Sequence, residues 1–161
     1  MLIRCIILSV LAGIGLVLAG PARSGGPVVL TVEGRIEGEA SRDFTISDLE
    51  KLGVTSVTTS TPWHDKIVTF EGVRLADLMA YVGATGDQVE GVALNNFYAE
   101  IPRSDFTTYD ALLAFKADGA YLGVRDKGPL FVIYPFDRFP ELKNELYYSR
   151  SIWQLRRINV K

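Results

Sequence analysis

The sequence predicts an α+β fold in which strands outnumber helices and form a mixed sheet or barrel accompanied by short helices. Six segments show strand-like alternation or a short apolar run, whereas two show apolar residues at helical spacing. The chain of 161 residues has no internal repeat and no low-complexity tract. These observations favour one domain that mixes both kinds of element.

The first half of the domain is predicted to contain two strands and two helices. Residues 28–34, VVLTVEG, alternate as a strand does, and residues 66–73, KIVTFEGV, resemble a second strand. Between them, a short helix follows Thr45, which stands three residues before Asp48 at the spacing of a capping box. The second helix stops at Gly83 and has the following apolar residues at helical spacing: Leu75, Leu78, Met79 and Val82.

The second half is predicted to consist of strands. Residues 90–102, EGVALNNFYAEIP, form one strand, and residues 111–122, ALLAFKADGAYL, form another that enters a turn. Residues 128–136, GPLFVIYPF, are the most apolar strand of the chain. The last strand, within residues 151–161, has one irregularity and buries a face made by Ile152, Leu155, Ile158 and Val160.

Residues 1–24 have the order of a secretory signal peptide. Arg4 supplies a positive charge, residues 5–20 form an apolar run, and small and turn-forming residues follow. The run has 16 residues, slightly fewer than the roughly 20 that span a bilayer. The sequence therefore predicts a cleaved signal, export to the periplasm and a single domain of residues 25–161.

Charge and cysteine content narrow the function of the exported domain. Cleavage after Ser24 removes Arg4 and Arg23 from the 17 basic residues and none of the 19 acidic ones, which leaves a net charge of −4. Nucleic acid is therefore not an expected partner. The only cysteine, Cys5, is removed as well, so the domain has no disulfide and no thiolate. With a single histidine, no metal site is expected.

Trp63 and His64 form a notable pair, since the chain has two tryptophans and one histidine. The indole could stack on a heteroaromatic ring while the imidazole bonds to the edge of that ring. Alternatively, the tryptophan caps the core and the histidine bonds to a backbone carbonyl. The hydroxyls of residues 58–61 have no signature of an activated nucleophile, so binding and packing remain the two interpretations.

Two further segments could bind a ligand. In VRDKGPL, Arg125, Asp126 and Lys127 precede a Gly-Pro turn, and the two cations could hold an anionic or carbonyl-rich group. Alternatively, the segment is a solvated hairpin tip, which has the same local composition. Asn95 and Asn96 interrupt a strand-like segment in which asparagine is disfavoured. Their amides could meet a heterocycle edge, or they could make a bulge or an Asx turn.

Four segments carry a family resemblance: TPWHDKIVTFEGVRLADLMAYVGA, ALNNFYAEIP, LLAFKADGAYLGVRDKGPLFVIYPFD and YYSRSIWQLRRINV. Together they resemble the oxidoreductase molybdopterin-binding domain family, which has the sulfite-oxidase-type fold. The most specific pieces are FEGVRLADL, DGAYLGVRDKGPLFVIYPF and IWQL, and the resemblance covers residues 27–160. In catalytic members a cysteine ligates molybdenum a few residues before the tryptophan, whereas this sequence has Thr59 nearest that position.

The resemblance implies binding rather than catalysis. A threonine hydroxyl is a poor substitute for a thiolate on a transition metal, so molybdenum is not expected. Small exported members without the cysteine look like periplasmic pterin-binding proteins, and the resemblance leaves the pterin and its redox state open. A carboxylate such as Asp126 or Glu100 suits the amino-pyrimidinone end of a pterin. The binding residues that the resemblance implies are Trp63, His64, Asn96, Tyr98, Arg125, Asp126, Lys127, Tyr134 and Trp153.

The resemblance also implies a partner, because some such proteins are associated with inner-membrane enzymes of cyclic di-GMP metabolism. Residues 103–110, RSDFTTYD, and 138–150, RFPELKNELYYSR, are the predicted contact segments because they are polar, irregular and aromatic. Two other functions remain as alternatives. One is a molybdopterin-dependent oxidoreductase with atypical metal ligation, and the other is a plain periplasmic interaction module whose aromatic residues are core.

Overall fold

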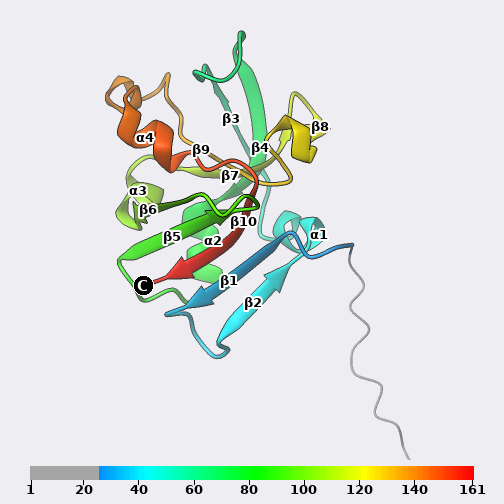
Figure 1. Ribbon diagram of the computed structural model, residues 1–161, viewed down its shortest axis with the longest axis vertical. Helices are drawn as coiled ribbons and strands as arrows, with labels where there is room; N and C mark the ends of the chain where they lie inside the picture. The colour runs from blue at the N-terminus through cyan, green and yellow to red at the C-terminus, as the bar shows by residue number, and fades with distance from the viewer. Residues whose placement is uncertain (1–25) are drawn as a thin grey trace, which may run out of the picture.

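The computed structural model describes residues 26–161 and confirms an α+β fold (Figure 1). Across the described residues, the strands form two open sheets rather than a closed barrel. No helix in residues 26–161 is long and apolar enough to cross a membrane. The predicted signal peptide lies outside the described residues.

Strands alternate with short helices along the chain. The strands are β1 Leu30–Gly34, β2 Ser41–Phe44, β3 Thr55–Thr59, β4 Val68–Arg74, β5 Gln88–Ala93, β6 Tyr98–Pro102, β7 Leu112–Ala117, β8 Ala120–Tyr121, β9 Phe131–Ile133 and β10 Leu155–Val160. The helices are α1 Ile46–Glu50, α2 Leu75–Tyr81, α3 Ser104–Thr108 and α4 Glu145–Arg150, with single 3-10 turns η1 Val124–Asp126 and η2 Pro140–Leu142. The sequence analysis missed β2, β3, α3 and α4.

The first sheet has the strand order β2-β1-β10-β5-β6. Its N-terminal and C-terminal strands, β1 and β10, pair in parallel, and the other neighbours pair antiparallel. The irregularity predicted for the last strand is confirmed as a register shift between Leu155 and Arg157. Its predicted buried face is also confirmed, because Ile152, Leu155 and Ile158 are at most 2% exposed.

The second sheet has the order β3-β4-β7-β8, and β9 also pairs with β7. Strand β7 lies between two apolar clusters, which explains its continuous apolar sequence. Leu113 and Phe115 belong to the larger cluster, which includes residues of the first sheet and α2. Leu112 and Ala114 belong to the smaller one, which contains Phe70 and Phe131.

The two predicted helices form where the sequence places them. At α1 the capping box is complete, since Asp48 N–H donates to the Thr45 hydroxyl and Thr45 N–H donates to the Asp48 carboxylate. In α2 the residues Leu75, Leu78 and Met79 are buried, and Gly83 follows with φ 61°. A glycine adopts this left-handed conformation without a steric penalty.

The segment predicted as one strand over residues 90–102 is a hairpin. Strands β5 and β6 pair antiparallel, and the two asparagines make the turn between them. Asn95 forms an Asx turn, because its Oδ1 accepts from Phe97 N–H at 3.0 Å. Asn96 adopts φ 66°, a conformation that asparagine tolerates better than most residues.

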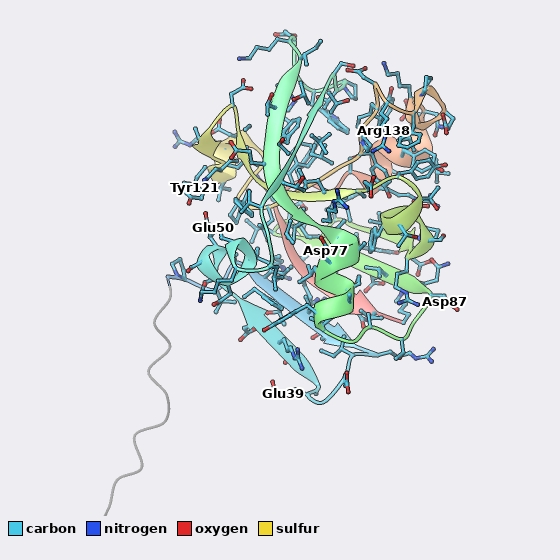
Figure 2. The ribbon with its side chains drawn as sticks, turned by 180° about the vertical axis from the view of Figure 1, so that it is seen from behind. Glu39, Glu50, Asp77, Asp87, Tyr121 and Arg138 are labelled. Atoms are coloured by element: carbon cyan, nitrogen blue, oxygen red, sulfur yellow. The ribbon has the colours of Figure 1, made fainter. Side chains whose placement is uncertain are left out.

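A side-chain contact joins the second sheet to α1. Tyr121 in β8 donates to Glu50 Oε1 at 2.6 Å, and Figure 2 shows the two labelled residues next to each other. Lys116 Nζ lies 4.5 Å from the centroid of the Tyr121 ring. These contacts attach the short strand β8 to α1, and neither β8 residue lines the cavity described next.

Candidate functional site

A cavity of about 360 Å³ lies where α4, the β5–β6 turn and the segment before β10 meet the loop after β3. Its volume falls in the range of sites for small organic ligands. Four of its nine lining residues are aromatic. The lining residues are Trp63, Asn95, Phe97, Glu145, Tyr148, Ser149, Ser151, Ile152 and Trp153.

Trp63 is the centre of the aromatic wall. Its ring centroid lies 5.7 Å from that of Trp153, 5.9 Å from that of Tyr148 and 5.6 Å from that of Phe131, each in edge-to-face geometry. The indole packs against both apolar clusters and also lines the cavity. The two interpretations of Trp63 are therefore compatible, since it caps the core on one side and faces the cavity on the other.

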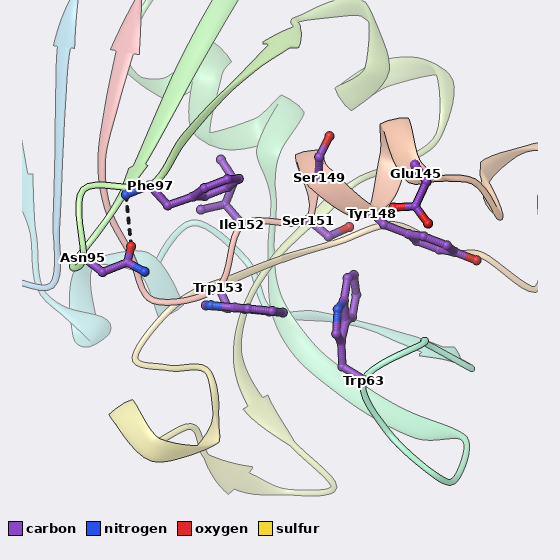
Figure 3. A pocket seen from close by; sticks show the side chains of 9 residues that line it. All are labelled: Trp63, Asn95, Phe97, Glu145, Tyr148, Ser149, Ser151, Ile152 and Trp153. Atoms are coloured by element: carbon purple, nitrogen blue, oxygen red, sulfur yellow. Dashed lines mark hydrogen bonds between the residues drawn. The ribbon is translucent and has the colours of Figure 1, made fainter.

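Phe97 and Trp153 present more of their rings to solvent. Phe97 is 48% exposed and Trp153 is 37% exposed. In Figure 3 their rings are seen edge-on at opposite sides of the cavity, with Trp63 standing across its end. Because both rings line the cavity and are partly exposed, each is available to contact a planar ligand.

The lining hydroxyls of Ser149 and Ser151 donate to backbone carbonyls of α4, whereas Asn95 and Glu145 contribute an amide and a carboxylate to the cavity. The Asn95 Oδ1 holds the Asx turn, so its amide nitrogen is available as a donor. Glu145 is exposed at the first position of α4, and its carboxylate has no hydrogen bond or ion pair with any residue from 26 to 161. The cavity therefore offers a donor at one side and a charged acceptor at the other.

Helix α4 presents its residues to the cavity because of its spacing and its cap. Asn144 accepts from Leu146 N–H at 2.9 Å and so begins the helix. Glu145, Tyr148 and Ser149 stand at positions i, i+3 and i+4, which share one face of a helix. All three line the cavity.

A buried ion pair holds the other end of α4. Arg150 Nη1 donates to Asp105 Oδ2 at 2.9 Å, and the Tyr134 hydroxyl donates to the same oxygen at 2.9 Å. The side chains of Arg150 and Asp105 are 15% and 9% exposed. Burial, followed by the charge of Asp105, raises the pKa of Tyr134 above its ordinary value. The two predicted partner segments, 103–110 and 138–150, thus meet through this pair.

Asp137 joins the loop after β3 to the segment that leads into α4. Its carboxylate accepts from Ser60 N–H and the Ser60 hydroxyl, both at 2.6 Å, and from Lys143 Nζ at 2.7 Å. These bonds, with that of Lys143 the largest cause, lower the pKa of Asp137 to about 2. The loop that carries Trp63 is therefore held at its start by a charged anchor.

Thr59 does not offer a ligand to the cavity. It is fully buried, its hydroxyl donates to the Ser60 carbonyl at 3.2 Å, and the same hydroxyl accepts from Asp137 N–H at 3.1 Å. Within the described part of the chain, no group of three or more His, Cys, Asp or Glu side chains is placed to hold a metal ion. The buried Thr59 hydroxyl, bonded within the fold on both sides, is therefore not placed to ligate a metal.

Of the predicted site residues, Trp63 and Trp153 line the cavity, and two others lie beside it. Lys127 Nζ is 5.8 Å from the Trp153 ring centroid. His64 does not line the cavity, because its Nδ1 shares a 2.7 Å hydrogen bond with the Thr61 hydroxyl and its ring packs against Phe70. Burial, and next the charge of Lys127, lowers the pKa of His64, so the neutral imidazole is favoured.

The structure does not bring the remaining predicted residues to the cavity. Asn96 instead accepts from Arg156 Nη2 at 2.9 Å. Tyr98 is 63% exposed on β6, and Tyr134 is fully buried in the core. Arg125 and Asp126 are exposed on η1.

Sequence reasoning missed most of the polar wall and two aromatic rings. Of the two carboxylates suggested for the ligand, Glu100 is paired with Lys161 Nζ at 2.9 Å and Asp126 is exposed on η1, whereas the carboxylate that lines the cavity is Glu145. The signal for α4 was present in Asn144, a residue that favours helix starts. The signal for the turn was the Asn95–Asn96 pair, which presents Phe97. Asn95, which was considered together with Asn96 as a possible ligand contact, does line the cavity, and the missed lining residues are Phe97, Glu145, Tyr148, Ser149, Ser151 and Ile152.

Comparison with known proteins supports the fold alone. The crystal structure of the sulfane dehydrogenase SoxCD from Paracoccus pantotrophus is similar to this chain, with a TM-score of 0.61 and 19% sequence identity. The likeness covers 81% of this chain and 37% of that protein, so the chain spans well under half of its length. No protein-family model and no curated protein sequence matches the chain.

Proposed function

We propose that this chain is a periplasmic pterin-binding protein without catalytic activity, and that its ligand occupies the cavity beside Trp63. The carrying observation is that aromatic side chains line an open cavity of about 360 Å³ together with the Glu145 carboxylate, which has no hydrogen bond or ion pair within residues 26–161. A pterin is a flat bicycle with polar groups along its edge, and both features match this lining. The sequence motifs and the fold likeness to SoxCD support a sulfite-oxidase-type fold for the domain.

The polar groups suit the two ends of a pterin. The ring N–H and the exocyclic amine of its pyrimidinone are adjacent donors, and the Glu145 carboxylate is a charged acceptor. The Asn95 amide would donate to a ring nitrogen or carbonyl. Phe97 and Trp153 would contact the faces of the bicycle, and Lys127 would lie near its outer edge.

The alternative of a molybdenum enzyme has weaker support. Thr59 uses its hydroxyl within the fold, as donor to Ser60 and as acceptor from Asp137. A buried hydroxyl so engaged is a poor ligand for a soft metal. Binding without catalysis is therefore the better-supported function. Molybdenum at one atom per chain in purified protein would instead favour the oxidoreductase.

The same proposal includes a relay to an inner-membrane signalling enzyme of cyclic di-GMP metabolism. The two segments suggested for contact, residues 103–110 and 138–150, are joined by the Asp105–Arg150 pair and flank the helix that lines the cavity. A ligand shifts such a complex only by binding its free and partner-bound forms with different affinity, typically by about 1–3 kcal/mol.

Mass spectrometry of what co-purifies tests the ligand. Protein purified from the periplasm is denatured, and the released small molecules are identified alongside a fluorescence titration of the refolded protein with biopterin and tetrahydrobiopterin. We expect a released pterin and quenching of tryptophan fluorescence by at least one of the two probes. Absence of both would contradict the proposal.

The relay is tested separately. Membranes are extracted and incubated with wild-type protein or with Trp153→Ala, each with and without tetrahydrobiopterin. We expect the pterin to change the amount of the cyclic di-GMP enzyme that is recovered with wild-type protein. With the Trp153→Ala variant, we expect the pterin to leave that amount unchanged. Unchanged recovery and unchanged cyclic di-GMP output in every arm would refute the relay while leaving pterin binding intact.

A further inference from the structure

Three edge strands of the two sheets, β2, β6 and β8, have features that oppose pairing with another chain, whereas the edge strand β3 lacks them. At the margins of the first sheet, β2 carries Arg42 and Asp43, and β6 carries Glu100 and ends at Pro102. Charges and proline on an edge oppose pairing with another chain. In the second sheet β8 has two residues, whereas β3 has five, TSVTT, without charge or proline.

The outward backbone groups of β3 follow from its pairing with β4. Thr58 lies opposite Thr69. Thr69 turns its backbone toward Asp118, because its N–H donates to Asp118 Oδ1 at 3.0 Å and its carbonyl accepts from Asp118 N–H at 2.8 Å. The N–H and carbonyl of Thr58 therefore face away from β4, and by strand alternation those of Ser56 do too.

The outward-facing backbone groups of β3 are those of Ser56 and Thr58. The next residue in this alternation, Ser60, is already paired, because its N–H donates to Asp137 at 2.6 Å. Ser56 and Thr58 have exposed side chains, and no backbone partner outside the β3–β4 ladder is found for either among residues 26–161. Figure 1 shows β3 beside β4 at the margin of this sheet.

We propose that β3 pairs antiparallel with β3 of a second copy of this chain, about a twofold axis at Val57. In this register Ser56 lies opposite Thr58 of the second copy, and each such pair exchanges two backbone hydrogen bonds. The twofold axis generates this Ser56–Thr58 pair twice, so the interface contains four backbone hydrogen bonds. A twofold contact of this kind uses the same surface on both copies.

The side chains of β3 fit this partner. Every cross-strand pair joins two hydroxyl residues or two valines, so no like charges meet, and Thr–Thr and Thr–Ser pairs are favourable. Val57 packs against the smaller apolar cluster but is only partly buried. In the proposed register the two Val57 side chains form a non-hydrogen-bonded pair, where side chains approach closely. The second copy would thus cover an apolar residue that the monomer leaves open.

A charge-matched pair of variants tests the register. One variant carries Ser56→Lys with Thr58→Lys, and the other carries Ser56→Lys with Thr58→Glu. In sedimentation velocity over a concentration series, we expect wild type to dimerise, the first variant to remain monomeric, and the second to dimerise, since the introduced lysine faces the introduced glutamate. Wild type that is monomeric at every soluble concentration, or two variants that behave alike, would overturn the proposal.

A cross-link provides a readout that does not depend on loss of association. Val57→Cys would place two cysteines across the axis at a Cα separation of about 4.5 Å, which a disulfide can span. We expect a covalent dimer under mild oxidation, whereas the control Thr107→Cys, exposed on α3, stays monomeric. Equal cross-linking of the two variants would contradict the pairing. Because β3 lies outside the cavity lining, pterin binding should be unchanged in all of these variants.

Discussion

The indoles of Trp63 and Trp153 are perpendicular, with an interplanar angle of 89° and ring centroids 5.7 Å apart. They are 90 positions apart in the sequence and meet because both contact Phe131, Trp63 by ring packing and Trp153 through an isolated strand bridge. The two rings have different environments. Trp63 also packs against Phe136 and Tyr148, whereas Trp153 is more exposed.

This difference predicts that substitution of Trp153 mainly affects ligand binding, whereas substitution of Trp63 mainly affects the free energy of unfolding. Trp153→Ala should abolish quenching by tetrahydrobiopterin and change the free energy of unfolding by about 1 kcal/mol or less. Trp63→Ala should lower the free energy of unfolding by about 3 kcal/mol, since it removes a ring packed against several others. Urea unfolding and fluorescence titration measure the two effects. Undiminished pterin affinity in Trp153→Ala would remove this residue from the site.

Glu145→Gln should weaken pterin binding by roughly 10-fold to 100-fold, because a hydrogen bond to a charged acceptor contributes about 1.5–3 kcal/mol. The matched control is Glu141→Gln, an exposed acidic residue in η2 that does not line the cavity. Isothermal titration calorimetry with tetrahydrobiopterin gives both affinities. Equal affinities of the two variants would show that Glu145 does not contact the ligand.

The Asp105–Arg150 pair should show strong coupling in a double-mutant cycle. Asp105→Ala leaves the Arg150 guanidinium buried without its partner and should lower the free energy of unfolding by about 3–5 kcal/mol. Arg150→Met in addition should recover part of this loss, since it removes the uncompensated charge. Urea unfolding of wild type, both single variants and the double variant gives the coupling. Additive effects would mean that the 2.9 Å contact contributes little.

Asp137 should make stability depend on pH in the acid range. Its pKa in the folded protein is about 2, below the ordinary 3.8, so its contribution is fully present above about pH 4 and is lost as the pH falls toward 2. Asp137→Asn should lower the unfolding temperature at pH 7 by roughly 3 °C, through lost hydrogen bonds to the carboxylate. The difference from wild type should shrink between pH 4 and pH 2 in thermal melts. A difference independent of pH would assign the effect to packing instead.

Local signals predicted much of the secondary structure. The capping box at Thr45 and Asp48 and the buried face of α2 involve residues within one or two turns, so their physics can be read from neighbouring letters. The same reasoning failed for residues 90–102, where alternation continues through the turn. There the asparagine pair, disfavoured in a strand, decided the outcome.

The candidate site was only partly predictable. Trp63 and Trp153, both implied by the resemblance, line the cavity, whereas Tyr134, implied by the same resemblance, is buried in the core. Glu145 was missed because α4 is short and has no apolar periodicity that would reveal which of its faces is turned inward.

The sequence by itself determined where α1, α2 and most of the longer strands lie, that residues 25–161 contain no cysteine, and that Thr59 stands where a metal ligand is expected by resemblance. Only the tertiary structure decided that β1 and β10 pair in parallel, and that α4 brings Glu145 to Trp63 and Trp153. The physical reason is the sequence separation over which the deciding interactions act. Caps, turns and periodicity depend on bonds between residues a few positions apart, whereas a cavity depends on how distant elements pack to bury their apolar faces, and that arrangement minimises the free energy of the whole chain.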